Sequence, residues 1–208
     1  MKNTISRLVG AACLLAGAAS MPAAAVPVTS LVGATPLTTP VKNIFGTGPF
    51  NFAPGITWSS NGSDAAFGST DGYGFDANGD WDYNKTLVAT NDSTSSMTFT
   101  FDTAVSGFGG FLNWAPGSGE ASIAAYDVNH ALIESLVLSF LTDGSLNSGA
   151  FYGFQEGGTS IKYFTLTGAY IAGANFEVKT VPEPASMALS LLGLGLLGAM
   201  SRRKQKQA

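Results

Sequence analysis

The feature that most limits how this chain can fold is a series of short β-type runs separated by clusters of Gly, Asn and Asp. In one of these runs Met97, Phe99 and Phe101 alternate with Ser and Thr, which is the period-2 pattern of a strand with one buried face. Residues 104–114 form a run that Gly interrupts several times, which permits bulges or a close approach of backbones. Runs of this kind, with almost no helical periodicity, predict an all-β domain.

We expect strands in segments spaced by about 8–12 residues. These segments are 56–59, 96–102, 104–114, 121–128, 131–140, 150–155, 160–167 and 170–178. Residues 131–140 (ALIESLVLSF) could also form an amphipathic helix, but the alternation in their second half favours a strand. The pattern predicts an antiparallel β-sandwich or jelly roll of about eight or nine strands.

The domain is expected to follow a lead-in. Residues 26–54 are rich in Pro, Thr and Gly and show little periodicity, so we expect an extended segment with one edge strand near 41–45. Residues 55–180 would then form the sandwich. Between 26 and 180 the chain has four Lys and no Arg against thirteen Asp and Glu, a formal net charge of −9. This charge argues against nucleic acid or anionic lipid as a partner, and solubility after export explains it well.

The last 28 residues combine three parts in a fixed order. The first part is the motif Val181, Pro182, Glu183 and Pro184. The two prolines keep it extended, whereas the uncharged residues 185–200 favour a helix about 24 Å long, a little short of a ~30 Å hydrocarbon core. A basic cluster at 202–206 ends the chain and would stay in the cytoplasm, which leaves the preceding domain outside. We therefore expect a transmembrane helix at 185–200.

This order of parts resembles the PEP-CTERM sorting signal of Gram-negative bacteria over residues 181–208. The resemblance implies recognition by an exosortase, an inner-membrane enzyme similar to cysteine proteases that is thought to cut at or near the motif. It implies an exported protein of the extracellular space or outer cell surface, anchored in the inner membrane through 185–200 before processing. Such proteins are often linked to exopolysaccharide or biofilm. The alternative is an ordinary C-terminal membrane anchor, which also leaves the domain outside the cytoplasm.

The N-terminal end agrees with export. A positively charged start precedes an apolar run at 8–19, and small residues follow at Ala23 and Ala25. This arrangement predicts a signal peptide over the first 25 residues, which signal peptidase removes before Val26. The only cysteine, Cys13, follows a poor lipobox, so we reject a lipoprotein. The mature protein then has no cysteine for a disulfide or a thiol nucleophile.

Stretches between residues 55 and 178 also resemble a group of bacterial proteins that carry the same tail. Examples are GITWSSNGSDAAFGSTDGYGF and SMTFTFDTAVSGFGGFLNW. That group has no established activity, so the resemblance implies a sandwich and export but no chemistry. Its sandwich-type relatives often close on a strand that contains an aspartate, where this chain has Ala174, Asn175 and Phe176. No ligand role of such an aspartate carries over.

One segment is a candidate calcium loop. Oxygen-bearing side chains occupy every second position: Asp76, Asn78, Asp80 and Asp82. Ca²⁺ takes six to eight oxygen ligands, and this spacing is similar to the start of a calcium loop. An EF-hand is excluded, because its sixth and twelfth positions would be Trp81 and Leu87. Plain turns are also rich in Gly, Asn and Asp, so an ordinary turn is the alternative.

Aromatic residues among Gly, Asn and Asp are candidates for sugar contacts. The set is Trp58, Tyr73, Phe75, Trp81, Tyr83 and Trp114. Exposed rings can stack on sugar faces, but aromatic rings also dominate sandwich cores. Trp58 and Trp114 lie in strand-like runs, so we expect them to be buried. Tyr73, Trp81 and Tyr83 lie in a turn-rich loop and are the candidates for exposure and carbohydrate contact.

Catalytic residues are scarce. His130, the only histidine, falls at an expected hairpin turn, where a solvated side chain is a simpler interpretation than a general base. Carboxylates that could pair for glycoside hydrolysis exist at Glu120, Asp127, Glu134 and Glu156, but nothing in the sequence places any two of them about 5–10 Å apart. We therefore predict a non-enzymatic matrix or surface protein. The alternative is a secreted carbohydrate-active enzyme on a jelly-roll scaffold.

Overall fold

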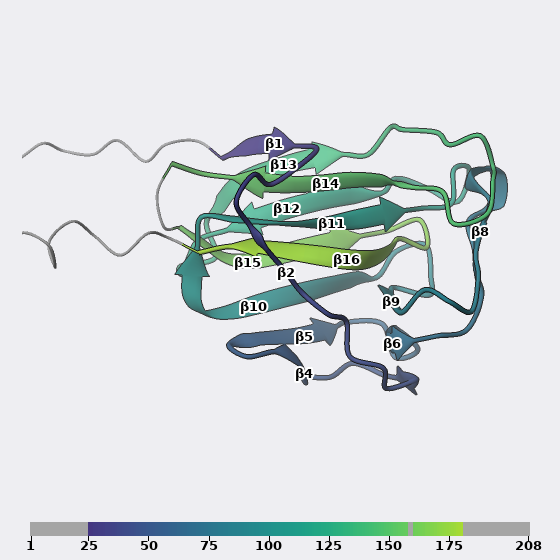
Figure 1. Ribbon diagram of the computed structural model, residues 1–208, viewed down its shortest axis with the longest axis horizontal. Coiled ribbons are helices and arrows are strands. Elements are labelled where there is room, and N and C mark those ends of the chain that lie inside the picture. Colours follow the sequence, from purple (N-terminus) through teal and green to yellow (C-terminus); the bar gives the residue numbers. More distant parts are fainter. Residues whose placement is uncertain (1–24, 158–159, 181–208) are drawn as a thin grey trace, which may run out of the picture.

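The computed structural model describes residues 25–157 and 160–180, and strands dominate this part of the chain (Figure 1). It contains 16 strands and one short 3-10 helix, η1 (Asp76–Asn78). The expected number of eight or nine strands is therefore too low. Most of the additional strands have only two to four residues, and such short segments show no readable alternation in the sequence.

The larger of the two main sheets has eight strands, all paired antiparallel. Its order is β1 (Val26–Val28), β14 (Ala150–Gln155), β11 (Gly107–Asn113), β16 (Ala172–Lys179), β9 (Leu87–Ala89), β6 (Ala66–Ser69) and β3 (Ile44–Phe45). The eighth strand, β2 (Thr35–Pro36), pairs with β16. The strands β1, β2 and β3 come from the expected lead-in, which therefore supplies three strands to this sheet and not only one edge strand. β3 lies at the edge of the sheet, as expected.

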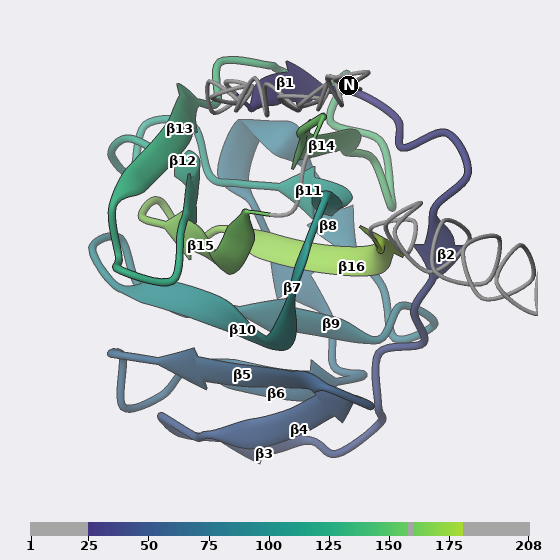
Figure 2. The same cartoon turned by 90° about the vertical axis from the view of Figure 1, so that its left-hand side faces the viewer.

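The second main sheet has six antiparallel strands. Its order is β13 (Leu132–Val137), β12 (Ser122–Tyr126), β15 (Ile161–Thr167), β10 (Ser96–Val105), β5 (Ile56–Ser60) and β4 (Phe50–Ala53). The strand interpretation of residues 131–140 is confirmed by β13. A separate ribbon joins β7 (Tyr73–Gly74) to β8 (Asp80–Trp81). Figure 2 shows β12 and β15 in one layer and β11 and β16 in the other, which is the two-sheet antiparallel sandwich that the sequence predicts.

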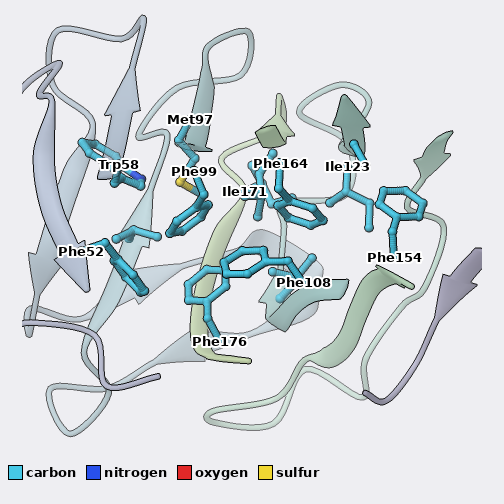
Figure 3. Close-up of a cluster of buried hydrophobic side chains, with 14 of the residues drawn as sticks. Phe52, Trp58, Met97, Phe99, Phe108, Ile123, Phe154, Phe164, Ile171 and Phe176 are labelled. Atoms are coloured by element: carbon cyan, nitrogen blue, oxygen red, sulfur yellow. The ribbon is translucent and has the colours of Figure 1, made fainter. Parts of the chain in front are cut away.

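Aromatic side chains fill the space between the layers (Figure 3). Phe99 of β10 lies 4.9 Å from Phe108 of β11 and 4.7 Å from Phe176 of β16, measured between ring centroids. Trp58 and Trp114 are buried, as expected. Buried aromatic rings contribute large apolar areas, and paired rings add about 0.5–1.5 kcal/mol each beyond burial. This core holds together strands that are distant in sequence.

A second apolar cluster covers the outer face of the eight-stranded sheet. Its buried members are Ala66, Phe75, Trp81, Leu87, Ala89, Ala172 and Ala174. Along β16, Ala174 belongs to this outer cluster whereas Phe176 belongs to the central core. The change of face occurs at Asn175, where φ is +47° and the pairing with β11 shifts register. A regular strand would place Ala174 and Phe176 on one face, and this bulge puts them on opposite faces.

Glycines allow β11 and β14 to approach closely. A Cβ atom on Gly109 would lie 2.8 Å from the Cα of Gly153 and 2.8 Å from the carbonyl oxygen of Tyr152. No side chain fits at that distance, so the glycine-broken run at 104–114 reflects a close backbone contact, as predicted. Within residues 25–157 and 160–180, no helix has the length and apolar character needed to span a membrane. The helix expected at 185–200 lies outside the described residues.

Candidate functional site

The edge of β16 that faces β9 is only partly covered. β2 pairs with Glu177 and Val178, while β9 pairs with Ala172 and Gly173. Between these two contacts lies Asn175, whose side chain is exposed. Beyond Pro36 the N–H of Leu37 still donates to the carbonyl of Phe176 at 2.8 Å, but no described strand pairs with Asn175 on this edge. The chain therefore leaves a gap in the sheet at Asn175.

A cavity of about 480 Å³ opens at this gap. Its walls are residues 37–39 after β2, Asp82, Asn84, Lys85 and Thr86 before β9, Asn147 from the loop before β14, and Asn175. The volume falls within the range of about 300–1,000 Å³ that is typical of small-molecule sites. Four chain segments that are far apart in sequence thus build one polar cavity.

The wall before β9 is a tight turn centred on Asp82. Its carboxylate accepts hydrogen bonds from the backbone N–H and the side-chain amide of Asn84, at 3.1 and 3.3 Å. The backbone N–H of Asp82 donates to Oδ1 of Asn147 at 3.1 Å. The Asn84 backbone N–H is the main cause that holds the pKa of Asp82 below its usual range, and the Asn147 amide adds to it. Asp82 is therefore an ionised acceptor at neutral pH.

The ammonium group of Lys85, next to this turn, lies over two aromatic rings. Its Nζ is 4.8 Å from the ring centroid of Trp81 and 4.6 Å from that of Phe111. Such cation–π contacts stabilise an ammonium group by about 0.5–2 kcal/mol. Partial burial lowers the pKa of Lys85, and the charge of Asp82 opposes this shift. The cavity thus contains one positive and one negative side chain, which balance each other.

Thr39, on the opposite wall of the cavity, has a buried hydroxyl group. Its side chain is only 6% exposed, and within the described residues its Oγ1 has no hydrogen-bond partner. A buried hydroxyl without a partner costs about 1–3 kcal/mol. Thr38 and Thr39 are fixed at both sides, because the N–H of Leu37 donates to the carbonyl of Phe176 at 2.8 Å and that of Lys42 donates to Gly68 at 2.9 Å.

A smaller cavity of about 250 Å³ lies against the six-stranded sheet. Its walls are Thr98, Tyr126, His130, Tyr163 and Thr165. His130 occupies the turn between β12 and β13 with a φ of +60°, and its ring stacks on Tyr163 with 4.1 Å between centroids. The histidine is exposed at a hairpin turn, as the sequence predicts.

The three predicted carbohydrate contacts have different environments. Trp81 is 1% exposed, stacks on Phe111 at 5.9 Å and donates from its Nε1 to the carbonyl of Ser148. The expectation that Trp81 is exposed is therefore wrong, because the loop folds back onto the outer face of the eight-stranded sheet. Tyr73 is partly buried, and burial raises the pKa of its hydroxyl above the usual range. Tyr83 is 74% exposed, between two residues that line the larger cavity.

The predicted calcium ligands have other contacts in the structure. Asn78 is fully buried, donates to the carbonyl of Trp114 at 3.1 Å and accepts from the N–H of Thr142 at 3.0 Å. Asp76 accepts from Ser118, Asp80 is exposed, and Asp82 accepts from Asn84. In the described part of the chain, no group of three or more His, Cys, Asp and Glu side chains is placed to hold a metal ion. The calcium loop stays a prediction that no contact in the structure supports.

The four carboxylates considered for glycoside hydrolysis lie on different elements. Asp127 accepts from the N–H groups of Asn129 and Ala131 in the β12–β13 turn, and Glu134 is on β13. Glu156 follows β14 in the other sheet and is 7% exposed, whereas Glu120 precedes β12. Among the described residues that line the larger cavity, Asp82 is the only carboxylate.

Sequence reasoning missed most of the cavity. It selected Asp82, but not Thr39, Asn147 or Asn175. These residues come together only through strand pairing across the sheet. A signal was present at Asn175, because asparagine is disfavoured inside a strand and occurs there in an otherwise apolar run.

The predicted processing sites lie at the borders of the described chain. Val26, the expected mature N-terminus, is the first residue of β1, and Ala25 is buried. Ala23 and the motif Val181, Pro182, Glu183 and Pro184 lie outside the described residues.

A family model described as PEP-CTERM protein-sorting motif matches residues 180–204. The chain therefore carries a PEP-CTERM sorting motif, which implies export, sorting to the cell surface and processing by an exosortase.

Comparison with solved structures finds partial similarities. A fucose-binding module of Streptococcus pneumoniae has a TM-score of 0.33 and 14% identity over 48% of this chain and 72% of its own. The lectin domain of lectinolysin, complexed with Lewis B antigen, has a TM-score of 0.39 and 13% identity over 62% and 94%. CBM32 of AlyQ, in complex with 4,5-unsaturated mannuronic acid, has a TM-score of 0.31 and 17% identity over 46% and 78%. No curated protein sequence matches the chain. Nothing about the ligand of this chain follows from likenesses of this size.

Proposed function

We propose that the protein is a non-enzymatic component of the extracellular matrix or outer cell surface, released or displayed by an exosortase and associated with exopolysaccharide. The observation that carries this proposal is the sorting motif, which begins at residue 180, directly after β16 ends at Lys179. In this proposal the sandwich is the exported part and the tail directs it to the surface.

The polar cavity supports association with a polysaccharide. Most of its walls are neutral amides and hydroxyl groups, and Tyr83 next to it exposes an aromatic ring. Glycoside hydrolysis ordinarily needs two carboxylates about 5–10 Å apart, and Asp82 is alone among the described lining residues. These features favour binding over catalysis, so the enzyme on a jelly-roll scaffold remains the less supported alternative.

The experiment is a fractionation of a host that has an exosortase and makes exopolysaccharide. The mature protein should appear in the extracellular polymer fraction, and enzymatic digestion of the polysaccharide should release it. Recovery of the protein in the freely soluble medium, with or without digestion, would contradict the association with polysaccharide. Recovery of the uncut chain in the inner membrane would contradict exosortase processing.

A further inference from the structure

We infer that the cavity at the gap beside Asn175 binds a neutral saccharide. This inference rests on the association with polysaccharide proposed above and adds the place of binding and the class of ligand. Amides and hydroxyls from four chain segments, with no net charge, surround a volume of about 480 Å³.

The walls match a ligand rich in hydroxyl groups. Asn84, Asn147 and Asn175 each carry an amide with donor and acceptor atoms, and three threonines add hydroxyls that also do both. Sugar hydroxyls likewise donate and accept, so each can pair with these wall groups either as a donor or as an acceptor. Leu37 is the only apolar side chain among the described lining residues, which disfavours lipids and flat aromatic ligands.

The charges select a neutral ligand. Asp82 and Lys85 balance each other, and the Lys85 ammonium is already placed over the rings of Trp81 and Phe111. A phosphorylated ligand would need several cations, and the described lining residues supply one. The domain carries a formal net charge of −9 between residues 26 and 180, which repels an acidic polymer.

Thr39 is a wall residue of the cavity with a buried hydroxyl group. Its Oγ1 is buried without a hydrogen-bond partner within the described residues, and the residue lines the cavity. Because Oγ1 itself is not accessible from the cavity, a ligand hydroxyl reaches it only if the threonine side chain rotates, and the new bond would then remove the cost of about 1–3 kcal/mol that an unpaired buried hydroxyl carries. The free protein thus holds a group whose hydrogen-bonding capacity is unused.

The cavity is held in shape before a ligand binds. Backbone hydrogen bonds from Leu37 to Phe176 and from Lys42 to Gly68 fix the threonine wall. Asn147 fixes the opposite turn through the N–H of Asp82. A site whose walls are already ordered loses little conformational entropy on binding, which favours affinity.

The test measures binding of soluble β-glucan, mannan, galactan and alginate fragments to the mature protein recovered from the exporting host, by titration calorimetry. Thr39→Val keeps the shape and removes the hydroxyl, and Asn175→Gly removes the amide at a position where φ is +47°. Two matched controls are Thr98→Val, in the smaller cavity, and Asn91→Gly, at an asparagine with φ of +59° outside both cavities. Thermal melts verify that each variant is folded.

We expect a neutral fragment to bind, with Thr39→Val and Asn175→Gly each weakening its Kd about 3- to 10-fold, as for the loss of one neutral hydrogen bond. The two controls should bind like the unchanged protein. Unchanged affinity in both cavity variants would overturn the assigned place while polysaccharide association stands. Loss of binding in Thr98→Val would move the site to the smaller cavity and overturn the inference. Tighter binding of alginate than of any neutral fragment would overturn the ligand class. No binding of any fragment would overturn the inference, whereas the association with polysaccharide is decided separately by the fractionation described above.

Discussion

The hydroxyl of Ser106 donates to the carbonyl oxygen of Lys179 at 3.0 Å and to that of Thr180 at 3.2 Å, and the Ser106 N–H also donates to Lys179. These contacts hold the sandwich to the residue at which the sorting motif begins. Lys179, the last residue of β16, also pairs with Gly107 of β11, so its release would break this pairing as well as the Ser106 contacts. The folded domain therefore extends up to the sorting motif with no spacer.

Both ends of the domain lie at the same end of this sheet. Gly107 pairs with Lys179 on one side and with Gln155 on the other, and Gln155 pairs with Val26. The expected signal-peptide junction and the sorting junction are thus neighbours in space.

A spacer at the sorting junction should speed processing. Only three residues separate Lys179 from Glu183, which reach about 10 Å when extended, so the enzyme must work close to the folded end. Insertion of six Gly and Ser residues between Thr180 and Val181 should increase the rate of precursor cleavage several-fold. Pulse-chase labelling measures this rate. The same insertion between Asn129 and His130, in a hairpin turn, is the control, and equal rates for all three proteins would show that the folded domain does not hinder the enzyme.

Asn78 should matter for stability. Its buried amide donates to the carbonyl of Trp114 and accepts from the N–H of Thr142, so Asn78→Ala leaves these two backbone groups without partners. We expect a loss of about 1–3 kcal/mol in the free energy of unfolding, measured by urea denaturation. Asn129→Ala, in an exposed turn, should change stability by less than about 0.5 kcal/mol. Equal free energies of unfolding for the two variants would mean that the Asn78 contacts do not stabilise the fold.

Calcium should leave the melting temperature unchanged. The side chains of Asp76, Asn78 and Asp82 are engaged with Ser118, the Trp114 and Thr142 backbone, and Asn84. An ion that bound only the folded protein would add about 2.7 kcal/mol at a concentration 100-fold above its Kd. Calorimetric melts in millimolar Ca²⁺ and in EDTA make the comparison, with Mg²⁺ as a control. A melting temperature that rises in Ca²⁺ alone would restore the calcium interpretation.

The sandwich could be predicted from the sequence because its long strands alternate clearly. Met97, Phe99 and Phe101 all point into the core, as their period-2 spacing indicates. The short strands β2, β8 and β9 could not be found, because two or three residues carry no periodicity. The bulge at Asn175 also escaped prediction, since it depends on the register with β11.

The site was harder to predict than the fold. Trp81 lies among polar residues in sequence, yet it is buried because residues 71–86 fold over the apolar outer face of a sheet. Nothing local in the sequence indicates that this face exists. In the same way, Thr39 and Asn175 meet at the cavity only because β2 and β9 share one edge of β16. Sequence reasoning finds residue types, whereas strand pairing decides their neighbours.

Glu156 should give a pH-dependent stability. Burial raises the pKa of its carboxyl in the folded state above the unfolded value, so the ionised form is penalised at neutral pH. The penalty disappears as pH falls through the folded pKa, where the folded protein binds the proton. Glu156→Gln should therefore stabilise the protein at pH 7 and have no such effect below about pH 4, where the carboxyl is protonated in both states. Urea denaturation at both pH values measures the free energy of unfolding, with the exposed Glu120→Gln as the control. An equal increase in this free energy for Glu156→Gln at both pH values would contradict the burial explanation.

The sorting motif gives the last prediction. Glu183→Ala hardly changes the hydrophobicity of the span at 185–200 or the basic residues that orient it, so a simple membrane anchor should tolerate it. A substrate that an exosortase reads should instead accumulate as an uncut precursor, about 2–3 kDa heavier than the mature protein from some 25 retained residues at ~110 Da each. Mass spectrometry after fractionation of a host with the exosortase measures both properties.

Ser186→Ala, a change of similar size just beyond the motif, is the control and should be processed like the unchanged protein. If Glu183→Ala and the unchanged protein have the same mass and occupy the same fraction, Glu183 does not direct processing. If, in addition, both proteins are uncut and in the inner-membrane fraction, the tail acts as a plain membrane anchor. If only Glu183→Ala is retained, recognition depends on the motif itself, because the apolar span and the basic cluster are identical in the Glu183→Ala variant and the unchanged protein.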